Sequence, residues 1–136
     1  MSDSVMQVFI EEIHRVVRNR DMRGIDDLVA EGAVLHTPRF LRPITERNHI
    51  VMVLQGILKF VDGFEYHRVF AQGNEAMMEF KGRIGEVQVH GIDLFTINDQ
   101  SKISTLTVFI RPTKALEAIG AMEDAFFAKM AAKPSN

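Results

Sequence analysis

The chain contains 136 residues, and 16 Lys and Arg side chains against 18 Asp and Glu give it a formal net charge of −2. That length is typical of one compact domain. Hydrophobic residues make up 46% of the chain, which excludes disordered and collagen-like architectures. The charges are spread over both halves without a basic patch, so we expect neither nucleic acid nor a membrane as a partner.

The sequence contains no cysteine, which excludes disulfides, Cys-ligated metal centres and a thiol nucleophile. The five histidines fall in different predicted elements without the spacing of metal ligands, so we expect no metal and no cofactor. No apolar run reaches the ~18 residues that a membrane span requires. The N-terminus also lacks the pattern of a secretory signal, and we expect a cytoplasmic protein.

Apolar residues at helical spacing predict four helices. The second is short, with Asp21 as its N-terminal cap and Gly32 as its terminator. In the last helix the apolar stripe runs through Ile119, Glu123 and Phe126. The three longer predicted helices cover residues 5–19, 46–61 and 113–130.

Between and after these helices the pattern favours strands over residues 33–37, 64–72, 75–84, 87–97 and 102–111. Short turns at Gly73-Asn74 and Gly85-Glu86 indicate antiparallel neighbours. The order α-α-β-α-β-β-β-β-α predicts an α+β domain with helices against one face of an antiparallel sheet. We expect one domain over residues 1–136, ordered over about 5–130, with a frayed tail at 131–136.

The predicted strand over residues 87–97 carries one carboxylate on an apolar face. Its odd positions are all apolar or glycine except Asp93, and strand geometry puts them on the same side. A buried carboxylate is costly unless it is paired, hydrogen-bonded or kept neutral by a raised pKa. Asp93 is therefore either an acid/base or hydrogen-bonding group in a cavity, or a structural carboxylate held by an arginine or by backbone N–H groups.

Other polar side chains lie near the ends of predicted strands. His36 and Thr37 point to opposite sides, so only one of them can face the interior and orient a ligand. Tyr66 is the only tyrosine and could place its hydroxyl in a cavity. Arg111 could anchor Asp93, although a surface position is the simpler interpretation. Glu79 alternates with apolar residues and reads as part of a charged outer face.

Two segments carry a family resemblance: DMRGIDDLVAEGAVLHTP at residues 21–38, and GIDLFTINDQSKI at 91–103 with LTVFIRP at 106–112. Together with the element order they resemble the SnoaL-like branch of the nuclear transport factor 2-like superfamily, over residues 5–130. The resemblance implies a cone, the cystatin-like α+β roll, in which a strongly curved sheet wraps around a long helix. It also implies a pocket at one end, frequent homodimers and a wide range of activities.

Matched to the ketosteroid isomerases of that superfamily, the oxyanion-hole aspartate falls on Asp93. The general-base aspartate falls on Thr37 and the oxyanion-hole tyrosine on Ile13, so this sequence keeps one of the three groups. Thr37 cannot replace a carboxylate base near neutral pH, and Ile13 cannot donate a hydrogen bond. The resemblance further implies an apolar lining made by Leu35, Met78, Phe80, Val89, Phe95, Leu106, Val108 and Ile110.

We therefore expect a pocket for a small hydrophobic molecule, with Asp93 as its acid/base group and isomerase, cyclase or dehydratase chemistry. Thr37, or else His36 or Tyr66, would orient the ligand. The alternative is a non-catalytic ligand-binding or dimerising module of the same fold. The expected homodimer would use the outer face of the sheet, through His90, Ile92, Leu94, Thr107 and Phe109.

Overall fold

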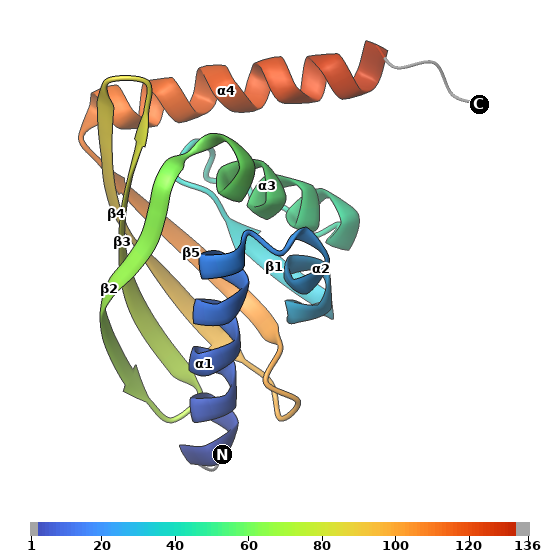
Figure 1. The fold of residues 1–136 in the computed structure, drawn as a ribbon. Coiled ribbons are helices and arrows are strands. Elements are labelled where there is room, and N and C mark those ends of the chain that lie inside the picture. The colour runs from blue at the N-terminus through green and yellow to red at the C-terminus, as the bar shows by residue number, and fades with distance from the viewer. Residues whose placement is uncertain (1–2, 133–136) are drawn as a thin grey trace.

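The computed structural model describes residues 3–132 and has the predicted α+β class and element order. Figure 1 shows a strongly curved sheet with helices on its concave side. The helices are α1 (Asp3–Asn19), α2 (Met22–Leu28), α3 (Arg47–Phe60) and α4 (Thr113–Ala132). The strands are β1 (Val29–His36), β2 (Asp62–Gln72), β3 (Glu75–Ile84), β4 (Val87–Ile97) and β5 (Ile103–Arg111).

The sheet has the strand order β1-β5-β4-β3-β2, and the last four strands in the chain pair antiparallel as predicted. Gly73 and Gly85 lie at the two hairpin turns with φ of 60° and 58°, a conformation that glycine adopts at no steric cost. β1 pairs in parallel with β5, with Leu35 opposite Leu106. No local turn signal announces such a pair, because parallel neighbours are joined by long connections.

One predicted boundary is wrong. Gly32 has the expected positive φ of 75°, but it lies inside β1, and α2 already ends at Leu28. The pairing of β1 with β5 shifts register between Val29 and Val34, so the residues around Gly32 form an irregularity in the strand. Positive φ suits a helix terminator and a strand bulge equally, and the sequence pattern did not separate the two.

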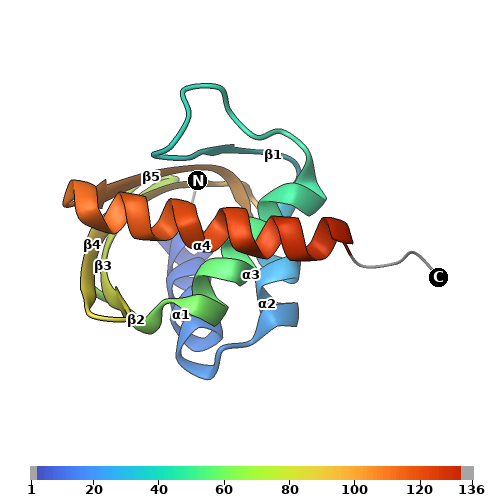
Figure 2. The same ribbon diagram turned by 90° about the horizontal axis from the view of Figure 1, so that it is seen from above.

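α1 fills the concave side of the sheet because one stripe of the helix is apolar. Phe9 and Val16 have no exposed surface, and the Phe9 ring meets the Phe95 ring of β4 edge-on at 5.1 Å. α3 packs against β1 and α2 and is buried on more than one side, as its apolar sequence predicts. α4 crosses one end of the curved sheet and passes over α3, which Figure 2 shows from above. The helices and the sheet thus enclose a space inside the cone.

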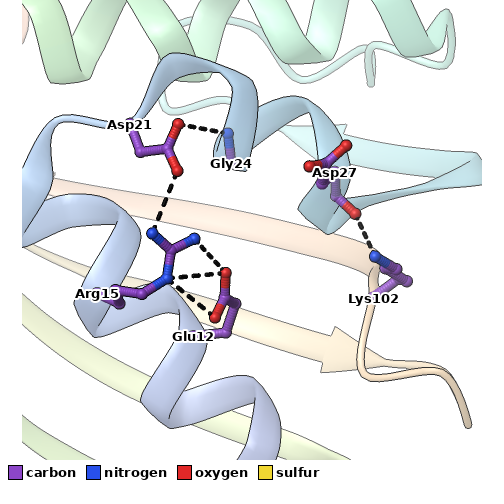
Figure 3. A network of polar contacts seen from close by, with 6 residues as sticks. All are labelled: Glu12, Arg15, Asp21, Gly24, Asp27 and Lys102. Carbon is purple, nitrogen blue, oxygen red and sulfur yellow. Dashed lines mark hydrogen bonds and ion pairs between the residues drawn. The ribbon is translucent and has the colours of Figure 1, made fainter.

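A polar network fixes α2 against α1 (Figure 3). Arg15 bonds Glu12 and also reaches Asp21, with Nη1 3.2 Å from Oδ2. The other Asp21 oxygen accepts the backbone N–H of Gly24 at 3.0 Å, so Asp21 is the predicted cap of α2. A Cβ at Gly24 would lie 2.7 Å from the Val16 side chain, so the close approach of α2 to α1 requires glycine.

The predicted frayed tail is described only in part. Ala131 and Ala132 still belong to α4, and residues 133–136 lie outside the described residues. Within residues 3–132, no helix is long and apolar enough to cross a membrane.

Candidate functional site

A cavity of about 70 Å³ lies between the concave face of the sheet and the helices. Its wall is almost wholly apolar, and Asp93, Tyr66, Thr37 and Glu123 are the polar side chains that reach it. α1, α3 and α4 all contribute apolar residues, among them Ile13, Val53 and Ile119. The other residues predicted for the lining that reach this cavity are Leu35, Phe80, Val89, Phe95, Leu106, Val108 and Ile110.

Two residues predicted for the ligand site do not line the cavity. Leu35 points inward, so His36 is turned to the outer face of the sheet, where it pairs with Thr107. Met78 faces inward but has no exposed surface, because the core packs around it on every side. His36 and Met78 therefore lie outside the wall of this cavity, and their ligand-binding roles remain predictions.

Asp93 is 7% exposed and points into the cavity from β4. The Tyr66 hydroxyl donates a hydrogen bond to Asp93 Oδ2 at 2.6 Å. Burial raises the pKa of Asp93 to about 7, and the bond from Tyr66 opposes that rise only in part. Burial, and then the neighbouring carboxylate, also raise the pKa of Tyr66 well above its ordinary value. Tyr66 is therefore a fixed hydrogen-bond donor, and Asp93 can hold a proton at neutral pH.

Arg111 is not the partner of Asp93. Its guanidinium lies on the outer face, with Nη1 3.3 Å from Nδ1 of His90. Among residues 3–132, Tyr66 provides the one hydrogen bond made to the Asp93 side chain, and no cation contacts it. No fully buried side-chain oxygen or nitrogen in this part of the chain lacks a partner, so Asp93 Oδ1 reaches the open space of the cavity. A protonated Oδ1 can donate to a ligand oxygen there.

Aromatic rings hold Tyr66 in place. Its ring centroid lies 5.4 Å from that of Phe64, 6.5 Å from Phe80 and 6.4 Å from Phe95, each edge-on. Phe80 in turn lies across the strand pair from Gly91, where a Cβ would come within 2.4 Å of the ring. Packing of this kind leaves the Tyr66 hydroxyl little freedom to leave Asp93.

A second carboxyl group, Glu123 of α4, lines the same cavity and was missed by the sequence analysis. Its Oε1 accepts from Arg39 Nη1 at 3.3 Å. Burial raises the pKa of Glu123, and Arg39 works against that rise. The signal was present: Glu123 lies on the apolar stripe of its helix beside Ile119, just as Asp93 lies on the apolar face of its strand. Across residues 3–132, no group of three or more metal-ligating side chains is close enough to hold an ion.

A family model described as the SnoaL-like domain matches residues 10–105. This chain belongs to the SnoaL-like domain family. The match runs from the middle of α1 to the first residues of β5, so it includes Tyr66 and Asp93 of the cavity but not α4 and Glu123. No curated protein sequence matches this SnoaL-like domain.

The family match confirms the SnoaL-like resemblance, and a solved structure confirms the cystatin-like fold. A steroid delta-isomerase from Pseudomonas aeruginosa is 28% identical with a TM-score of 0.90, over 96% of this chain and 97% of the isomerase. A conserved bacterial protein with a cystatin-like fold from Silicibacter pomeroyi is also 28% identical, with a TM-score of 0.77 over 92% of this chain and 86% of its own. An NTF2-like protein from Burkholderia xenovorans, at 14% identity and a TM-score of 0.68, shares the fold over 79% of this chain and 84% of its own.

Proposed function

We propose that this SnoaL-like domain binds a small apolar carbonyl compound and catalyses proton transfer at the carbon next to the carbonyl. The observation that carries this proposal is the Asp93 carboxyl, which lies in an apolar cavity with Tyr66 bonded to one of its oxygens. When the proton leaves the carbon, negative charge develops on the carbonyl oxygen. A protonated Asp93 can donate a hydrogen bond to that oxygen, and in a dry site such a donor favours the transition state.

The likeness to a steroid delta-isomerase supports the same reaction class. The cavity suggests a smaller substrate, however. Its volume of about 70 Å³ is below the roughly 150 Å³ of an apolar protein cavity that holds benzene. A single ring is therefore the largest compound that we expect, and its entry requires small movements of the aliphatic side chains around the cavity.

Binding of 4-methylphenol tests the role of Asp93, because a phenol oxygen resembles the enolate oxygen of the proposed intermediate. Toluene is the matched control without a hydroxyl. We expect calorimetry to show 4-methylphenol binding about tenfold more tightly than toluene, since one net hydrogen bond contributes about 1–1.5 kcal/mol. Asp93→Leu should bind both compounds equally. A phenol that does not bind, or a preference that survives in the variant, would contradict the proposal.

The second candidate function is a binding module without catalysis. It is favoured by Thr37 and Ile13, which line the cavity where the resemblance places the base and tyrosine of ketosteroid isomerases. Such a module would bind 4-methylphenol through Asp93 and turn over no carbonyl compound. Turnover is therefore the measurement that separates the two candidates.

We also propose a homodimer through the outer face of the sheet, in the cytoplasm. Phe70, Met77 and Phe109 on that face are 64%, 40% and 52% exposed, and exposed apolar side chains gathered on one face are typical of an interaction surface. Sedimentation equilibrium of the wild type and of Phe109→Asp tests the dimer, and we expect the variant to sediment as a monomer. A wild-type monomer would contradict it. Fractionation of cells that express the protein tests the compartment.

A further inference from the structure

Removal of a proton from carbon requires a base, and Asp93 cannot fill that role while it donates a hydrogen bond to the substrate oxygen. Tyr66 cannot either, because its hydroxyl donates to Asp93 and its pKa is raised well above the ordinary value. Thr37 reaches the cavity with a hydroxyl, which is not a base near neutral pH. Among the described residues that line the cavity, the remaining ionisable side chain is Glu123.

We propose that Glu123 is the general base of this cavity and takes the proton from the carbon next to the substrate carbonyl. The inference rests on the proposed function and adds a residue from α4, outside the segment matched by the family model. The resemblance places the base of ketosteroid isomerases at the position of Thr37, which cannot act as a base. Glu123 would supply the base from a different element.

The two carboxyl groups enter the cavity from different walls, Asp93 from β4 and Glu123 from α4. A substrate between them can place its carbonyl oxygen at Asp93 and a neighbouring carbon toward Glu123. Oε1 of Glu123 is bonded to Arg39, and Oε2 makes no hydrogen bond to a residue within 3–132. Since no fully buried oxygen there lacks a partner, Oε2 reaches open space and is available to accept a proton.

Arg39 is a positioning residue for this base. It comes from the loop between β1 and α3, which projects beside α4 (Figure 2), and it bonds both Glu123 and Asp124 of that helix. Gly120 makes room for it, because a Cβ there would lie 3.0 Å from Arg39 Nε. The Arg39 guanidinium holds Oε1 of Glu123, and Oε2 takes no part in this bond.

The two carboxyl groups differ in the charges around them. Arg39 and His49 of α3 stabilise the charged form of Glu123, whereas burial and Asp124 oppose it. Asp93 has only the Tyr66 hydroxyl to stabilise its charge. Burial thus raises the pKa of both carboxyl groups, but Arg39 limits the rise for Glu123 and no cation does so for Asp93. Two carboxyl groups with such different surroundings can act as base and hydrogen-bond donor.

For a β,γ-unsaturated ketone the proposed step balances without a cofactor. Glu123 removes a proton from the carbon between the carbonyl and the double bond, and the electron pair of that C–H bond forms a new carbon–carbon double bond. The carbonyl π electrons move to the oxygen, which is hydrogen-bonded by Asp93. Glu123 then returns the proton to the γ carbon, and the carbonyl re-forms in conjugation with the shifted double bond.

The test uses cyclohex-3-en-1-one, a single-ring ketone whose isomerisation to cyclohex-2-en-1-one is followed by ultraviolet absorbance. We expect the wild-type chain to catalyse it. Glu123→Gln should lower kcat/KM by about 10²- to 10⁴-fold, the usual contribution of a general base. Binding of 4-methylphenol should be unchanged in this variant. Glu117→Gln makes the same chemical change on the exposed side of α4 and should leave the rate unchanged.

Glu123→Ala distinguishes a base from a structural carboxylate. Added formate should restore part of its turnover, because a small carboxylate can occupy the space left by the side chain. Full activity in Glu123→Gln, or no rescue of Glu123→Ala, would overturn the assignment. A wild type that binds 4-methylphenol without isomerising the ketone would also overturn it and leave the binding module. A wild type that does neither would overturn the proposed function itself.

Discussion

Two buried carboxyl groups lie on neighbouring strands and face opposite sides of the sheet. Asp93 of β4 faces the cavity and is 7% exposed, and Glu79 of β3 faces outward and is 8% exposed. Although little of either residue is exposed to solvent, their pKa values move in opposite directions. That of Asp93 rises to about 7, whereas hydrogen bonds from Arg68 and then from His90 hold that of Glu79 far below its usual range.

The difference lies in the partners. Arg68 bonds Glu79 with two nitrogens, at 2.7 and 2.8 Å, and Nε2 of His90 lies 2.7 Å from Oε2. A register shift between Tyr66 and Val69 of β2 brings Arg68 to that face. Glu79 lies on the outer face, as predicted, but its neighbours cover it. Burial raises the pKa of a carboxyl group most where no cation compensates it.

The largest effect that we expect from this comparison is a change in the free energy of unfolding of Asp93→Asn. Asp93 keeps its proton in the folded state up to about pH 7, whereas its ordinary value is 3.8. The buried, protonated carboxyl therefore contributes its full stability below pH 3.8, and this contribution is lost as the pH rises through about 7. At pH 8 Asp93→Asn should be more stable than the wild type by up to about 4 kcal/mol.

Urea unfolding of both proteins at pH 4 and pH 8 measures this difference, which should disappear at pH 4. A constant difference at both pH values would mean that Asp93 has no raised pKa in the folded protein. Asn retains an acceptor for the Tyr66 hydroxyl, so the hydrogen bond itself is kept in the comparison.

Glu79→Gln should have a smaller effect, of opposite sign. The lowered pKa of Glu79 means that its charge stabilises the fold above its ordinary value of 4.5, and that this contribution is lost as the pH falls through the lower folded pKa. The effect is modest because Arg68 is 70% exposed and its charge is screened by solvent. Thermal unfolding at pH 7 should show a lower midpoint for the variant, and 1 M salt should narrow the gap. A stabilised variant at pH 7 would contradict the comparison.

Much of the sheet could be predicted from sequence because its signals are local. Glycine turns set both ends of β3 and the start of β4, and both strands have the predicted bounds. Alternation along β4 then placed Asp93 on the inner face, which is buried as expected. The parallel pairing of β1 has no such signal, since it depends on contacts between distant segments.

The cavity was predicted less completely for the same reason. Strand periodicity identifies the face on which a side chain lies, but not whether space is left beside it. Met78 and Phe80 face the same side of β3, yet only Phe80 reaches the cavity. Glu123 needs one further piece of information, the path of α4 across the end of the sheet, and that path is set by tertiary packing rather than by helix periodicity.

The location of α4 separates the chemistry of this domain from its architecture. Tyr66 and Asp93 are held by strands whose backbone hydrogen bonds define the fold. Glu123 is carried by the last helix, which meets the rest of the molecule mainly through side chains and follows all the sheet pairings in the chain. Substitutions along one face of that helix can therefore exchange the base, its cation or the depth of the cavity while the sheet keeps its register. A family with one such replaceable wall can acquire different reactions without changing its fold.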